Sequence, residues 1–134
     1  MKQFPATGME MTHILAVLDL GRSRDWYRDV LGATLTGEYG GTSAVFNFQG
    51  AWLLIVTPGG ETRDKPGTQF APPPDPSKIS HSITIRVPDC RAAYQLLRSR
   101  GAEFLTEPVE SGWEIRCFFR DPDGHLFEIS ERRG

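Results

Sequence analysis

The stretch Asp121-Pro122-Asp123-Gly124-His125-Leu126-Phe127-Glu128 decides the fold of this chain. A polar turn with Pro and Gly leads directly into a segment in which apolar and polar residues alternate, the pattern of a half-buried β-strand. This strand carries a carboxylate, Glu128, near the end of the sequence. Such a residue could be a metal ligand, a partner for a buried cation, or part of the exposed face of an edge strand. Residue type alone leaves all three interpretations open.

Composition limits the class of protein. With 134 residues, of which 39% are hydrophobic and 24% charged, the chain fits one soluble globular domain. The formal net charge of -2 argues against a nucleic-acid partner. The sequence has neither an apolar run long enough for a membrane span nor a secretory type of start, so we expect a cytoplasmic protein without a membrane partner. Cys90 and Cys117 lack zinc-type spacing, and we expect both to be free thiols.

The same succession of elements occurs twice. Each half begins with an alternating strand, continues into an amphipathic helix that ends at a glycine, Gly32 or Gly101, and closes with further strands. Between the halves lies a segment rich in Pro and Gly that includes Pro72-Pro73-Pro74, which disfavours helix and central strand alike. We therefore predict one α+β domain over residues 1–134, with modules at about 10–57 and 80–131 and a linker at about 58–79.

The alternation and the breaks also predict where each element lies. The expected strands cover 13–18, 33–38, 43–48 and 51–56 in the first module and 82–87, 102–105, 114–119 and 126–130 in the second, and the expected helices cover 22–31 and 90–100.

Three features together resemble a known superfamily. They are the βαβββ order repeated twice, Tyr27-Arg28-Asp29-Val30-Leu31-Gly32 at the end of the first helix, and Asp121-Pro122-Asp123-Gly124 before the last strand. The chain resembles the vicinal oxygen chelate superfamily, which includes glyoxalase I, extradiol dioxygenases, fosfomycin-resistance enzymes and bleomycin-binding proteins. The resemblance covers roughly residues 10–131. It implies two modules that form a curved, incomplete barrel with a ligand or a metal on the concave face. Enzymes and pure binding proteins share this fold, so the site residues must decide between them.

The resemblance also implies where metal ligands would lie. In the superfamily pattern, the first ligand of each module precedes the Asp at the end of its strand by seven residues. Counting back from Asp19 leads to Thr12, and counting back from Asp89 leads to Ser82. Neither residue is a nitrogen ligand of the kind that transition metals favour.

The carboxylate positions are compared by matching residues 50–54 to residues 124–128. Leu54 then stands where the carboxylate of the first module would be, while Glu128 keeps a ligand-type side chain. One carboxylate and two hydroxyl groups make a poor transition-metal site. Our preferred prediction is therefore a protein without a metal cofactor.

Two histidines provide the alternative. His13 and His81 each lie one residue away from the expected ligand position, and a shift of one residue turns a strand side chain to the opposite face. A bulge or a slip at the strand start could still turn these histidines to the face that carries the expected ligands. His13, His81 and Glu128 would then hold Zn, Ni, Mn or Fe, as in an enzyme of the glyoxalase, dioxygenase or thiol-transferase type.

Without a metal, the charge of Glu128 needs compensation. Alternation places Arg86 and Arg116 on the cavity side of their strands, and we expect them to be its partners. Aromatic walls with a few polar groups are typical of a pocket for a planar or amphipathic small molecule. The residues predicted to bind this ligand are Thr12, Trp52, Leu54, Ser82, Thr84, Arg86, Arg116, Phe118 and Glu128.

Two functional hypotheses remain open. The preferred one is a metal-independent pocket that binds or sequesters a small organic molecule, as the bleomycin-binding relatives do, or that acts on it through Glu128 as an acid or base. The alternative is a divalent-metal enzyme, such as a glyoxalase-like lyase or a dioxygenase. Related two-module proteins commonly complete the cavity across a symmetric interface, so the resemblance also implies a homodimer.

Overall fold

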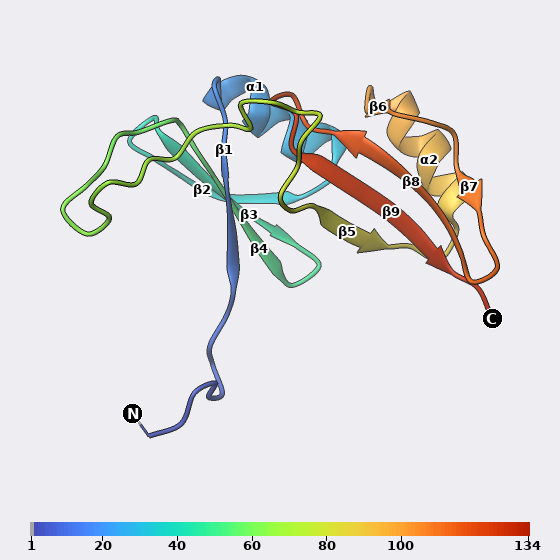
Figure 1. The fold of residues 1–134 in the computed structure, drawn as a ribbon, viewed down its shortest axis with the longest axis horizontal. Helices are drawn as coiled ribbons and strands as arrows, with labels where there is room; N and C mark the ends of the chain where they lie inside the picture. Colours follow the sequence, from blue (N-terminus) through green and yellow to red (C-terminus); the bar gives the residue numbers. More distant parts are fainter. Residues whose placement is uncertain (1) are drawn as a thin grey trace.

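The computed structural model describes residues 2–134, which contain two βαβββ modules, the second with one additional short strand (Figure 1). The first module contains β1 (Thr12–Ala16), α1 (Leu20–Asp25), the π-helical turn η1 (Trp26–Val30), β2 (Thr34–Tyr39), β3 (Ser43–Phe48) and β4 (Ala51–Val56). The second contains β5 (Ile83–Arg86), α2 (Cys90–Ser99), β6 (Glu103–Phe104), β7 (Val109–Glu110), β8 (Glu114–Arg120) and β9 (Leu126–Arg132). The predicted elements differ from these mainly at their ends, and β7 was not predicted.

The two sheets repeat one topology. The 4-stranded sheet has the order β1-β4-β3-β2, and the 5-stranded sheet has the order β5-β9-β8-β6, with β7 paired to β8. In each module the first strand runs parallel to the last, whereas the other paired strands are antiparallel. The sheets of residues 2–134 do not close into a barrel. The α+β fold with a duplicated module is therefore confirmed.

Both helices begin and end in the same way. A carboxylate oxygen of Asp19 accepts the backbone N–H three residues on at 2.9 Å, and Asp89 does the same at 3.0 Å. These contacts are N-caps, which satisfy N–H groups that have no partner inside the helix. Gly32 and Gly101 follow the two helical segments with φ of 82° and 102°, a conformation that glycine adopts without strain. The duplicated sequence signals thus produce duplicated local structure.

One hydrophobic core serves both modules. The ring of Tyr27 is fully buried between the two sheets, with its centroid 5.8 Å from that of Phe46 and 6.0 Å from that of Phe127. The neighbouring Trp26 lies 5.8 Å from Phe127 and 6.2 Å from Phe119. The first helical segment therefore packs on the inner face of the second sheet as well as on its own.

The polar turn before β9 adds directed contacts to this packing. One carboxylate oxygen of Asp123 accepts the backbone N–H of Leu18 at 3.0 Å, and the other accepts the hydroxyl of Ser23 at 3.2 Å. Arg22 completes the set with an ion pair at 3.3 Å. The turn of the second module is thus tied to the start of α1 in the first.

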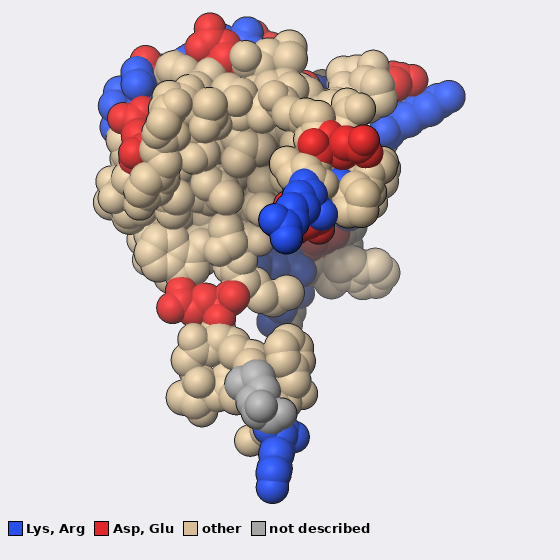
Figure 2. Space-filling view, turned by 90° about the vertical axis from the view of Figure 1, so that its left-hand side faces the viewer, with Lys and Arg blue, Asp and Glu red and all other residues tan. Residues whose placement is uncertain are grey.

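Two segments lie outside the sheets. Residues 57–82 connect β4 to β5 as an irregular segment with isolated bridges between Gly59 and Phe70 and between Thr62 and Lys65. Residues 2–11 precede β1 and project away from the sheets (Figure 1, Figure 2), and they expose Phe4 and Met11. No helix within residues 2–134 has the length and apolar character that a membrane crossing needs.

Candidate functional site

The face of the second sheet opposite α2 carries a group of polar side chains. Strand pairing sets Thr84 beside Glu128 and Arg86 beside Ser130, and residues paired across strands share a face. On the other side of β9, Arg116 pairs with Ser130. We call the face of the second sheet that carries Thr84, Glu128 and Ser130 the open face. The polar cluster on it consists of Thr84, Arg86, Glu114, Arg116, Glu128 and Ser130.

Glu128 is the buried acid of this cluster. The residue is only 8% exposed, and its Oε1 accepts the hydroxyl of Thr84 at 2.6 Å. Its Oε2 lies 3.7 Å from a guanidinium nitrogen of Arg116, whose side chain is 52% exposed. A carboxylate offers about four acceptor positions, so Glu128 keeps capacity for a donor group of a ligand. The ion pair is long and partly solvated, and we expect it to contribute little to stability.

A chain of contacts links Glu128 to the far end of the cluster. The hydroxyl of Ser130, fully buried, donates to Glu114 at 2.7 Å and accepts from Arg86 at 2.8 Å. Arg116 approaches Glu114 at 3.2 Å as well as Glu128. Hydrogen bonds in such a network hold each other in place. The cluster is therefore a connected set of polar groups.

The two predicted arginines take different partners. Arg116 approaches Glu128 and lies over the ring of Phe118, with 5.6 Å between the guanidinium carbon and the ring centroid. Arg86 instead binds Ser130 and lies 3.7 Å from Glu114. Sequence reasoning omitted Ser130 and Glu114 from the site. The period of two could have found both, because Ser130 follows Glu128 by two residues and Glu114 precedes Arg116 by two.

The predicted residues of the first module lie on their own sheet. Thr12 pairs with Trp52, and Leu54 pairs with Ile14, which is 41% exposed. The indole N–H of Trp52 donates to the carboxylate of Glu10. Within residues 2–134, no hydrogen bond or ion pair joins this apolar group to the polar cluster. Ser82, predicted as a further ligand-binding residue, is exposed just before β5.

The two histidines lie next to each other, His13 on the first strand of the first module and His81 just before the first strand of the second. The rings of His13 and His81 are stacked, with centroids 5.1 Å apart. His13 follows Thr12 on β1. His81 lines a cavity together with Ile83, and the next residue, Thr84, lies on the open face beside Glu128. Burial, and then the proximity of His81, lowers the pKa of His13.

The structure was also searched for an assembled metal site. Across residues 2–134, no three His, Cys, Asp or Glu side chains come together in a group that could hold one metal ion. A metal held by His13, His81 and Glu128 therefore stays a prediction, which the chelation experiment below tests.

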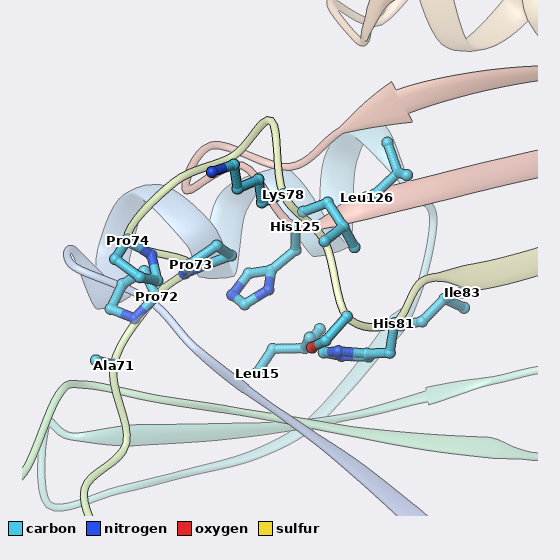
Figure 3. Close-up of a pocket in the computed structure, with 12 residues that line it drawn as sticks. Leu15, Ala71, Pro72, Pro73, Pro74, Lys78, His81, Ile83, His125 and Leu126 are labelled. Atoms are coloured by element: carbon cyan, nitrogen blue, oxygen red, sulfur yellow. The ribbon is translucent and has the colours of Figure 1, made fainter.

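A cavity of about 240 Å³ lies beside the histidines, beneath the connecting segment (Figure 3). Pro72, Pro73 and Pro74 form one wall, and the ring of His125 points into the space. A ring nitrogen of His125, Nε2, lies 2.7 Å from the carbonyl oxygen of Ala16, and since that oxygen accepts, the nitrogen must donate. This bond joins β1 to the start of β9 and gives His125 a structural role.

Comparison with known proteins agrees with the topology. Residues 10–129 match the Glyoxalase/Bleomycin resistance protein/Dioxygenase superfamily. The lactoylglutathione lyase of Haemophilus influenzae is 29% identical over 93% of this chain and 94% of its own length. The metallothiol transferase FosB of Staphylococcus saprophyticus is 30% identical over 85% of this chain and 70% of its own length.

A solved structure shows the same fold. It is a mutant of the fosfomycin resistance protein FosX from Listeria monocytogenes, complexed with Mn(II) and a dihydroxypropylphosphonic acid. It covers 92% of this chain and 89% of its own, with 18% identity and a TM-score of 0.65. Because the duplicated βαβββ topology is accompanied by a match along nearly the whole sequence, the chain belongs to the glyoxalase/bleomycin resistance protein/dioxygenase superfamily.

Proposed function

We propose that the protein binds a small organic molecule on the open face of the second sheet and that Glu128 is the group that recognises or acts on it without a metal. The observation that carries this proposal is a carboxylate only 8% exposed on a sheet face that no helix covers. It is held by a single hydroxyl at 2.6 Å and a distant guanidinium. A buried acid with spare acceptor capacity is typical of a binding or catalytic group.

The polar cluster supports two uses of this carboxylate. As a binding group, Glu128 would accept a hydrogen bond from a hydroxyl or amine of the ligand. As a general base, it would take a proton from the ligand, while Arg116 would donate hydrogen bonds to the oxygen on which negative charge develops. Thr84 would hold the carboxylate in position through either process. The same residues serve both uses, so a screen for ligands of the pocket comes before any test of catalysis.

A homodimer would supply the apolar side of the pocket. Trp52, Leu54 and Ile14 form an apolar surface on the first sheet, and the strands β1 and β5 each have one unpaired edge within residues 2–134. A symmetric dimer would place the apolar surface of one copy over the polar cluster of the other. We propose this arrangement because it would cover apolar side chains and enclose Glu128 together.

Binding of a small molecule is tested first by a thermal-shift screen of small aromatic and amphipathic compounds, followed by calorimetric titration of the hits. We expect Glu128→Gln to weaken binding about tenfold or more, since a hydrogen bond to a charged group contributes roughly 1.5–3 kcal/mol. Glu103→Gln, an exposed carboxylate on β6, should bind as the wild type does. Equal affinity in the two variants would contradict the role of Glu128.

The same titration is repeated on protein treated with a strong chelator. We expect unchanged affinity and unchanged turnover of any substrate. Loss of binding on chelation, with recovery on adding Mn(II) or Zn(II), would contradict a metal-independent site and favour the divalent-metal alternative.

The dimer is tested by sedimentation equilibrium of the wild type and Leu54→Glu. We expect the wild type to be a dimer at micromolar concentration and the variant to dissociate, because the new charge would be buried in the interface. A wild-type monomer at that concentration would contradict the proposed assembly.

A further inference from the structure

The polar cluster ends in a region of positive charge. Arg132 follows Ser130 by two residues on β9 and pairs with Glu114 across the ladder, so its side chain emerges on the open face beside Arg86. Within residues 2–134, the guanidinium of Arg132 forms no hydrogen bond and no ion pair. Arg86 has a 55% exposed side chain, and its Nη1 donates to Ser130 at 2.8 Å and lies 3.7 Å from Glu114, so its other N–H donors stay free.

An aromatic ring lies beside these arginines. Trp113 is 74% exposed and lines a shallow pocket in which three arginines, Arg86, Arg132 and Arg133, outnumber one carboxylate, Glu114. Arg133 is held by Glu110 at 2.9 Å, whereas Arg86 lies 3.7 Å from its carboxylate partner, Glu114, so Arg86 and Arg132 are the cations more available to a ligand. A large exposed ring next to guanidinium groups suits a partner that is both aromatic and anionic. The ring would stack, and the guanidinium forks would bind the oxygens of the anion in pairs.

The spacing along β9 limits the size of that partner. A strand rises about 3.3 Å per residue, so Arg132 lies roughly 13 Å from Glu128 along the strand, and Arg86, opposite Ser130, lies roughly 7 Å from it. A molecule with one or two rings spans this range. Such a ligand can therefore reach the two arginines with one end and Glu128 with the other.

We infer that the ligand of the open face is an aromatic compound with a carboxylate, sulfonate or similar anionic group, which Arg86 and Arg132 bind while its ring packs on Trp113. This inference rests on the proposed function, because it specifies the ligand class for the same face. The anion site lies at the rim of the cluster, and Glu128 faces the other end of the ligand.

The test uses two fluorescent dyes with the same aromatic skeleton on the full chain. Anilinonaphthalene sulfonate carries an anion, whereas phenylnaphthylamine is neutral. We expect the wild type to bind the anionic dye about tenfold more tightly, and Arg86→Gln and Arg132→Gln each to remove about that advantage while leaving the neutral dye unchanged. Arg63→Gln, an exposed arginine of the connecting segment, is the matched control and should bind both dyes as the wild type does.

Trp113 provides a second readout. Binding of the anionic dye should quench the fluorescence of Trp113. Trp113→Ala should weaken the binding of both dyes, because stacking does not depend on the charge. Equal affinity for the two dyes, or an equal loss of both in the arginine variants, would overturn the inference. A change of oligomeric state in Arg132→Gln would also overturn it, since the cations would then belong to a subunit interface.

The outcome for Glu128 separates this inference from the proposed function. If the arginine variants lose the anionic dye while Glu128→Gln binds every ligand of the screen normally, the anion site stands and the role of Glu128 fails. If Glu128→Gln loses the ligands of the screen while the dyes do not distinguish the arginine variants, the pocket stands and the anionic class fails.

Discussion

The phenolic hydroxyl of Tyr27 donates a hydrogen bond of 2.7 Å to Oδ2 of Asp121, which joins the first module to the turn that precedes β9. The other oxygen, Oδ1, accepts the backbone N–H groups of Asp123 and His125. Burial raises the pKa of Asp121 above its usual range, and burial followed by the nearby Asp121 raises the pKa of Tyr27 well above its own. The hydroxyl therefore stays protonated and available as the donor.

Tyr27→Phe removes this donor and leaves a buried carboxylate oxygen without its partner. We expect a loss of about 1–3 kcal/mol in the free energy of unfolding, measured by urea denaturation. Tyr39→Phe is the matched control, because Tyr39 is 60% exposed, and its effect should stay within about 0.5 kcal/mol. Equal stability of the two variants would show that the bond between the modules contributes nothing.

The stacked histidines predict a loss of stability in acid. The folded pKa of His13 lies below 6.5, chiefly through burial and then through His81 and His125. Between that lowered pKa and 6.5 the unfolded chain binds more protons than the folded chain, so the free energy of unfolding falls as the pH falls. Urea denaturation at about pH 7.5 and about pH 5.5 should show this loss, and His13→Gln should reduce it. An identical pH dependence in wild type and variant would contradict the assignment.

Gly124 is expected to resist substitution. Its φ is 95°, and a Cβ atom at this position would lie 3.2 Å from side-chain carbons of Pro76 in the connecting segment. Gly124→Ala should therefore cost about 1–2 kcal/mol from the backbone conformation alone. Gly59→Ala is the control, because its Cβ would meet no atom within 4 Å and its φ is not positive. Thermal denaturation of both variants decides the matter, and a Gly124→Ala protein as stable as the control would refute the strain.

The two cysteines should be unreactive in the folded protein. Both are buried, and burial raises the pKa of Cys117 to about 12 and also raises that of Cys90. Because the thiolate is the reactive form, we expect no reaction with a thiol reagent at neutral pH until denaturant is added. Glu107→Cys, which introduces an exposed thiol, serves as the positive control. Rapid labelling of the native wild type would contradict the buried placement.

The sequence predicted the strands and their faces because these depend on local signals. Caps at Asp19 and Asp89, the glycines after each helical segment, and alternation along β9 are all visible in the residues themselves. Local chemistry therefore accounts for the order of the elements and for the fold class.

Partners across strands and between sheets could not be read in this way. Arg86 binds Ser130 because β5 and β9 pair in one particular register, and the sequence alone does not fix that register. Alternation likewise gives the face of Trp52 and Leu54 but not the position of their sheet relative to the polar cluster. Their part in the pocket stays a prediction, which the dimer experiment addresses.

The core that runs through both sheets has a consequence for protein engineering. Tyr27 belongs to the first half of the sequence, yet it packs on Phe127 in the second. A half-length chain would expose one of these two rings to water. The first half would also lack the turn with Asp121, which accepts the hydrogen bond of Tyr27. Neither duplicated half is therefore a sensible truncation for expression, and the intact chain should melt in one cooperative step.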